Sequence, residues 1–151
     1  MMSVMLAAVL LGSNVATVGD AAPPFFLDTL GGGTLTIHAL RGHPALINVF
    51  ATWCPPCKME VPALVKASRT HPGVRFVFVD EQETPAQVTR FVHRYAVAST
   101  VAIDGGAFEA TYGVGSIPTT FVLDAHGVVR AIHRGPLTSH DVERMLSDAT
   151  H

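Results

Sequence analysis

The two cysteines of this 151-residue chain are Cys54 and Cys57, three positions apart in the segment TWCPPC. A disulfide between them would close a loop of only a few residues, so it would remove little entropy from the unfolded chain. Two thiols at this spacing suit dithiol–disulfide exchange, in which one thiolate attacks a disulfide and the second thiol resolves the mixed disulfide. We therefore predict that the pair is chemical and not architectural.

The position of Cys54 favours the thiolate that this exchange needs. The residue follows a predicted strand at 45–51, and Pro55 suits the first position of the helix that comes next. Unpaired N–H groups at a helix N-terminus stabilise a thiolate and lower the pKa of the thiol. Cys57 lies one turn later on nearly the same helical face, within reach of a mixed disulfide on Cys54.

Glu60 is the candidate acceptor for the proton of Cys57, because it lies three residues further along the same face. Partial burial there would raise the pKa of its carboxyl into a range that suits proton transfer near neutral pH. The alternative is an exposed glutamate that pairs with a lysine. Trp53 is expected to flank and shield Cys54, although simple packing at the strand end would also explain it.

The elements around the cysteines alternate between strands and helices. Apolar runs bounded by turn residues predict strands at 34–38, 45–51, 74–80, 99–104, 119–124 and 128–134. Helical spacing predicts helices at 55–71, with a kink at Pro62, and at 85–95 behind a Thr84 cap, 106–113, and 140–149 behind a Ser139 cap. This order predicts an α/β fold with a mixed central sheet and helices on both faces, in three layers.

The first 19 residues carry no charge, and the apolar run at 4–11 has the length of a signal-peptide core. No Lys or Arg precedes the run, which ends before the roughly 20 residues of a membrane-spanning helix. We predict a leader at 1–19, as a signal, an anchor remnant or an N-terminal extension, and one domain at 20–151. With 15% charged residues and a net charge of −2, the chain lacks the basic excess of nucleic-acid binders. We also expect the protein to be a monomer.

Three segments resemble the TlpA/ResA-like extracytoplasmic branch of the thioredoxin superfamily: VGDAAPPFFL, INVFATWCPPCKMEVPAL and GVGSIPTTFVLDAHGVV. They cover most of residues 18–130 in the expected order. The resemblance implies a thioredoxin-like fold and a thiol-disulfide oxidoreductase that uses a redox-active Cys54–Cys57 disulfide without another cofactor or a metal. Asn48 stands where cytosolic thioredoxins carry a buried aspartate, and Glu60 matches a glutamate of this branch.

The resemblance also implies a substrate-binding surface. Pro118 matches the family's cis-proline, which places the backbone of Ile117 beside the disulfide so that a client chain can pair with it. From the residues alone, Pro118 could equally begin an edge strand after a trans bond. The implied contact residues are Trp53, Pro55, Pro56, Ile117, Pro118 and Thr119. Members of the branch are typically exported or membrane-tethered, receive electrons from a membrane thiol relay, and reduce apocytochrome c or copper-site proteins.

Two other functions use the same cysteines. A peroxiredoxin would attack peroxide with Cys54, but its P-x-x-x-T-x-x-C pattern is missing and Ala51 stands at the threonine position. A Cu(I) or Zn(II) module would use both thiols as soft ligands. A closed zinc site needs two further ligands, and none of the eight histidines forms an H-x3–5-H pair near the cysteines.

Overall fold

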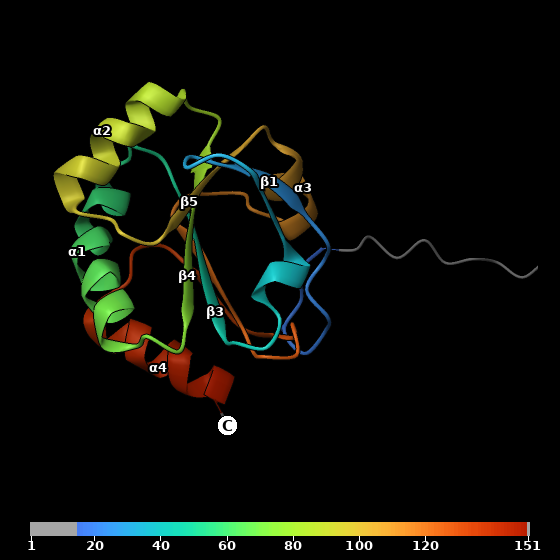
Figure 1. Ribbon diagram of the computed structural model, residues 1–151. Helices are drawn as coiled ribbons and strands as arrows, with labels where there is room; N and C mark the ends of the chain where they lie inside the picture. The colour runs from blue at the N-terminus through green and yellow to red at the C-terminus, as the bar shows by residue number, and fades with distance from the viewer. Residues whose placement is uncertain (1–14, 151) are drawn as a thin grey trace, which may run out of the picture.

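The structure is a computed structural model that describes residues 15–150. Seven strands form one sheet in the order β2-β1-β5-β4-β3-β6-β7 (Figure 1). The strands are β1 (Phe26–Thr29), β2 (Thr34–Thr36), β3 (Ala45–Phe50), β4 (Arg75–Glu81), β5 (Thr100–Asp104), β6 (Thr119–Leu123) and β7 (Val129–Arg134). The helices are α1 (Pro55–Thr70), α2 (Pro85–Tyr95), α3 (Ala107–Tyr112) and α4 (Ser139–Thr150), with a 3-10 helix η1 (Ile37–Leu40).

The sheet is mixed. Strands β3, β4 and β5 run parallel to one another, whereas β6 and β7 at one end and β1 and β2 at the other are antiparallel to their neighbours. Helices α1, α2 and α4 lie against one face and α3 against the other (Figure 1). The predicted three-layer arrangement is therefore confirmed. No helix among residues 15–150 is long and apolar enough to cross a membrane.

Strand β3 shows how the sequence builds two cores. All six of its residues are buried, and successive side chains point to opposite faces of the sheet. Leu46 and Phe50 pack in the cluster that includes Cys54 and Cys57, whereas Ile47 and Val49 pack in the cluster on the opposite face. Asn48 has the same parity as Leu46 and Phe50. The strand therefore places one polar side chain in the layer beneath α1.

Several local predictions are confirmed. Thr84 caps α2 in a reciprocal capping box with Gln87, and Gly113 ends α3 with a φ of 68°. The predicted kink at Pro62 stays a prediction, and α1 continues past that residue to Thr70.

Two local predictions were wrong. The expected strand at 34–38 stops at Thr36, because the next four residues form η1 and bury Ile37 and Leu40 in the core. The N-cap of α4 was expected to be Ser139, but it is Thr138. The Thr138 Oγ1 accepts a hydrogen bond of 3.1 Å from the Asp141 N–H, while Asp141 Oδ2 accepts one of 2.9 Å from the Thr138 N–H.

The N-terminal segment joins the domain before Asp20. The Ala16 side chain is buried, and the Gly19 N–H donates a 2.8 Å hydrogen bond to the Val129 carbonyl. The predicted apolar run at 4–11 lies outside the described residues. Ordered contacts therefore begin ahead of the predicted boundary at residue 20.

Candidate active site

The cysteines lie at the junction between the end of β3 and the start of α1. Cys54 is the N-cap of α1, and its Sγ accepts a 3.3 Å hydrogen bond from the Cys57 N–H. Pro55 follows at the first helical position, as predicted. The two cysteines form a disulfide with a Cα–Cα distance of 5.3 Å. Cys54 is 3% exposed and Cys57 is fully buried, so the second cysteine lies deeper, as its place in the helix predicts.

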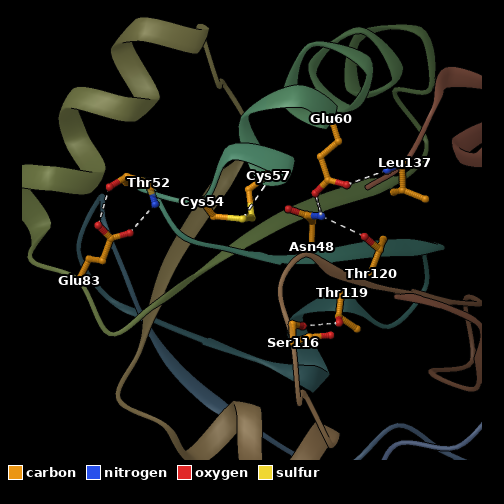
Figure 2. The surroundings of a disulfide bond; sticks show 10 residues. All are labelled: Asn48, Thr52, Cys54, Cys57, Glu60, Glu83, Ser116, Thr119, Thr120 and Leu137. Carbon is orange, nitrogen blue, oxygen red and sulfur yellow. Dashed lines mark hydrogen bonds between the residues drawn. A yellow bond between two sulfur atoms is a disulfide. The ribbon is translucent and has the colours of Figure 1, made fainter. Parts of the chain in front are cut away.

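Glu60 is fully buried in α1, which contradicts the alternative of an exposed glutamate paired with a lysine. Its Oε1 accepts a 2.6 Å hydrogen bond from Asn48 Nδ2, and its Oε2 accepts a 3.0 Å bond from the Leu137 N–H (Figure 2). Burial raises the pKa of Glu60 to about 7, and these two bonds only partly offset that effect. The carboxyl can therefore take up or release a proton near neutral pH.

Asn48 connects this carboxyl to the sheet. It is fully buried, and its Nδ2 also donates a 2.9 Å hydrogen bond to Thr120 Oγ1 on β6. Asn48 and Thr120 are direct cross-strand partners in the antiparallel pairing of β3 with β6. The network beneath the disulfide thus draws on two strands, α1 and the segment before α4.

A second carboxyl group holds the loop in front of the cysteines. Glu83, which follows β4, accepts hydrogen bonds from both the N–H and the hydroxyl of Thr52 (Figure 2). Burial opposes ionisation of Glu83, but hydrogen bonds involving Asp80 and Thr52 outweigh it and hold its pKa below the usual value. Sequence reasoning did not single out Glu83. The available signal was its place after β4, because the carboxyl ends of parallel strands meet at one edge of a sheet.

Asp80, at the end of β4, caps the same loop by accepting a 2.9 Å hydrogen bond from the Glu83 N–H. The residue is also fully buried. Burial, followed by the neighbouring Glu83, raises the pKa of Asp80 to about 8. Of these two neighbouring carboxyl groups, Glu83 is the one that carries the charge at neutral pH.

The residues implied to contact a substrate lie in two places, at the start of α1 and at the start of β6. The Ile117–Pro118 peptide bond is cis, as the resemblance implied. Ile117 is partly buried, and Thr119 is buried with its Oγ1 donating a 2.7 Å hydrogen bond to the Ser116 carbonyl. Trp53 is 64% exposed, so it does not pack at the strand end. Pro55 is exposed and Pro56 is half-buried.

Within residues 15–150, no group of three or more His, Cys, Asp or Glu side chains is close enough to hold a metal ion. Ala51, at the position of the peroxidatic threonine, is fully buried.

Comparisons with known proteins agree with this geometry. The family model described as Redoxin matches residues 17–148. The thioredoxin-like protein YneN of Bacillus subtilis strain 168 is 35% identical over 132 residues, which cover 85% of this chain and 78% of that protein. The thiol-disulfide oxidoreductase ResA of Halalkalibacterium halodurans is 32% identical over 137 residues, which cover 88% and 77%.

A solved structure gives the same result for the fold. The thiol:disulfide interchange protein of the thioredoxin family from Chlorobium tepidum TLS superposes with a TM-score of 0.77 at 31% identity, over 85% of this chain and 94% of that one. The implied thioredoxin-like fold is therefore confirmed. With this cysteine pair and these relatives, the chain belongs to the redoxin family and is a thiol-disulfide oxidoreductase similar to ResA.

Proposed function

We propose that this oxidoreductase acts as a reductant of disulfides in exported proteins, with Cys54 as nucleophile, Cys57 as resolving thiol and Glu60 as proton acceptor. The observation that carries the proposal is the buried Glu60 carboxyl, which lies one turn after Cys57 in α1 and is bonded to Asn48 beneath that helix. A buried carboxyl without a cationic partner is costly for stability, so its retention next to two thiols points to proton transfer.

The proposed cycle begins with the dithiol form. The Cys54 thiolate attacks one sulfur of a client disulfide, which forms a mixed disulfide and releases the other client sulfur as a thiolate. Cys57 then loses its proton to the Glu60 carboxylate, and its thiolate attacks Cys54 Sγ. The Cys54–Cys57 disulfide forms and the second client thiolate leaves. Two electrons have passed to the client, and an external dithiol must return them.

Client binding is assigned to the start of α1 around Cys54 and to the segment that enters β6. Trp53, Pro55 and Pro56 offer an accessible surface on one side. On the other side, cis-Pro118 positions the backbone of Ile117 so that an extended client segment can pair with it, and Thr119 continues into β6. The ring of Trp53, 64% exposed, supplies apolar area that a bound client would cover.

The cellular setting is part of the same proposal. We assign to the predicted leader at 1–19, whose Ala16 and Gly19 already contact the domain, the export or tethering of that domain outside the cytoplasm. In that oxidising setting a reductant needs a donor, for which a membrane thiol relay is the natural source. Apocytochrome c and copper-site proteins are the proposed clients, because their thiols must be reduced before cofactor loading. The working unit is proposed to be a monomer.

Trapping the covalent intermediate tests the sulfur chemistry. Cys57→Ser leaves Cys54 free to attack and removes the thiol that resolves the product, so a stable adduct with a disulfide substrate such as insulin should accumulate. Non-reducing electrophoresis and intact-mass measurement detect that adduct and its release by excess dithiol. Cys54→Ser is the matched control and should form no adduct.

Absence of the adduct in Cys57→Ser would contradict the assignment of Cys54 as nucleophile. Peroxide consumption faster than insulin reduction by the wild-type protein would instead favour a thiol peroxidase. Stoichiometric copper or zinc in the purified protein would favour a metal-binding module.

A further inference from the structure

Two hydrogen bonds orient the amide of Asn48. Its Nδ2 carries two hydrogens, and both have acceptors, at 2.6 Å in Glu60 Oε1 and at 2.9 Å in Thr120 Oγ1. A carboxylate can only accept hydrogen bonds, so the nitrogen and not the oxygen of the amide must face an ionised Glu60. The oxygen of Asn48 consequently points away from both partners.

Asn48 Oδ1 points toward the cysteine pair. Asn48 Oδ1 is buried, and no donor among residues 15–150 bonds to it. Figure 2 shows this oxygen on the side of the amide that faces Cys57, with the Glu60 and Thr120 bonds on the opposite side. A buried acceptor without a donor destabilises the fold, so an oxygen held in this way calls for an explanation.

The redox state of Cys57 supplies the explanation. In the disulfide neither sulfur carries a hydrogen, so neither can donate to the amide. Reduction adds two electrons and two protons to the pair, and a protonated Cys57 then carries an S–H group, which is a hydrogen-bond donor. The orphan oxygen of the disulfide form is therefore placed to be satisfied in the dithiol form.

We propose that Asn48 is a positioning residue of the dithiol state, in which its Oδ1 accepts the hydrogen of the Cys57 thiol while its Nδ2 keeps its bond to Glu60. This inference rests on the proposed roles of Cys57 and Glu60. One amide thus joins the proton donor of the resolving step to its proton acceptor. Ionised Glu60 polarises the Asn48 amide and so strengthens the hydrogen bond that Oδ1 accepts from the Cys57 thiol, because hydrogen bonds in a chain reinforce one another.

The arrangement gives the two thiols different tasks. A hydrogen bond from the Cys57 thiol favours its neutral form, so Cys54 is the only nucleophile of the free dithiol protein. The other buried carboxyl group near the Thr52 loop, Asp80, bonds to the Glu83 N–H, and Glu83 bonds to Thr52. Of Glu60, Asp80 and Glu83, only Glu60 is bonded to Asn48.

The stretching vibration of the S–H bond measures this contact directly. Cys54→Ala leaves Cys57 as the only thiol of the chain, so its infrared band is unambiguous. A donating S–H absorbs at lower frequency than a free one. We expect the S–H band of Cys54→Ala to lie at lowered frequency. Adding Asn48→Leu should abolish this shift. The double variant also shows whether the acceptor is the Asn48 amide or a backbone carbonyl of the preceding helical turn.

Thr120→Val in the Cys54→Ala protein is the matched control. It removes the Thr120 hydroxyl, the second acceptor of Asn48 Nδ2, but leaves Oδ1 in place, so the band should keep its shift. A band at the frequency of a free thiol in Cys54→Ala itself would overturn the proposal, and this measurement does not depend on whether Asn48→Leu folds. A shifted band that persists in a folded Asn48→Leu protein would overturn it too.

Failure of the proposed Asn48–Cys57 contact can be distinguished from failure of the proposed oxidoreductase mechanism. The infrared band needs no client and no turnover, whereas the trapped adduct of Cys57→Ser reports only on attack by Cys54. An adduct with an unshifted Cys57 band removes the role of Asn48 and leaves the oxidoreductase mechanism intact.

Discussion

Among single residues, Glu60 has a carboxyl whose ionisation the fold makes costly. Its pKa is raised from 4.5 to about 7, mainly by burial. Between these values the folded protein holds a proton that the unfolded chain has already released. The free energy of unfolding should therefore fall as the pH rises through this window and level off above it, by about 3 kcal/mol in all from this group.

Glu60→Gln should remove that part of the pH dependence, because glutamine does not titrate. Urea unfolding of the oxidised protein at several pH values between about 4.5 and 7 measures the slope. Asp148→Asn, which changes an exposed carboxyl on α4, is the control and should keep the wild-type slope. Equal slopes for Glu60→Gln and wild type would show that the buried carboxyl is not neutral in the folded protein.

Sequence spacing predicted the face shared by Cys54, Cys57 and Glu60, because three-residue steps along a helix preserve the face. It could not predict which groups meet Glu60 from elsewhere. Thr120 reaches the network only through the register of β6 against β3, and the Leu137 N–H comes from 77 positions further along the chain. Contacts of this kind follow from tertiary packing and leave no local pattern.

At the scale of the elements, the start of α4 offers a direct test. Thr138→Ala removes the side-chain acceptor for the Asp141 N–H and should cost about 1 kcal/mol, as the loss of an N-cap usually does. Ser139→Ala, one residue later, should change stability by less than about 0.5 kcal/mol. Urea midpoints of the two variants measure the difference. A larger loss for Ser139→Ala would assign the cap to the residue that the sequence favoured.

The misplaced cap has a physical cause. Threonine and serine are both good N-caps, and adjacent in a sequence they compete on nearly equal terms. Asp141 decides between them, because its side chain bonds back to Thr138 three residues earlier. Similarly, TLTIH reads as a strand, but Ile37 and Leu40 are three residues apart and both enter the core, which a 3-10 turn allows and a strand does not.

For the molecule as a whole, Tyr112 ties the N-terminal segment to the back of the sheet. Its ring is fully buried, and its hydroxyl donates a 2.7 Å hydrogen bond to the Pro23 carbonyl. Tyr112→Phe leaves that carbonyl without its donor and should lower the unfolding free energy by about 1–2 kcal/mol in urea.

Tyr95→Phe is the matched change. The Tyr95 ring packs on Phe91 with centroids 4.5 Å apart, and its hydroxyl bonds to none of residues 15–150. Removing that hydroxyl should change stability by less than about 0.5 kcal/mol. Equal effects of the two substitutions would mean that the bond to Pro23 contributes nothing.

The order of the elements made the layered fold predictable, since parallel strands joined by helices need a covered sheet. The place of β1 was not predictable in the same way. Its four residues pair with β2 and with β5, which is more than 70 positions away. A short segment such as this becomes a strand only when a distant edge is available to it.

The short span of the Cys54–Cys57 bond has a consequence for the working life of the molecule. Its ring encloses no strand, no crossover and no part of the sheet order, so opening and closing it leaves the global connectivity of the chain untouched. A catalyst built in this way alternates between two chemical forms without having to refold between turnovers.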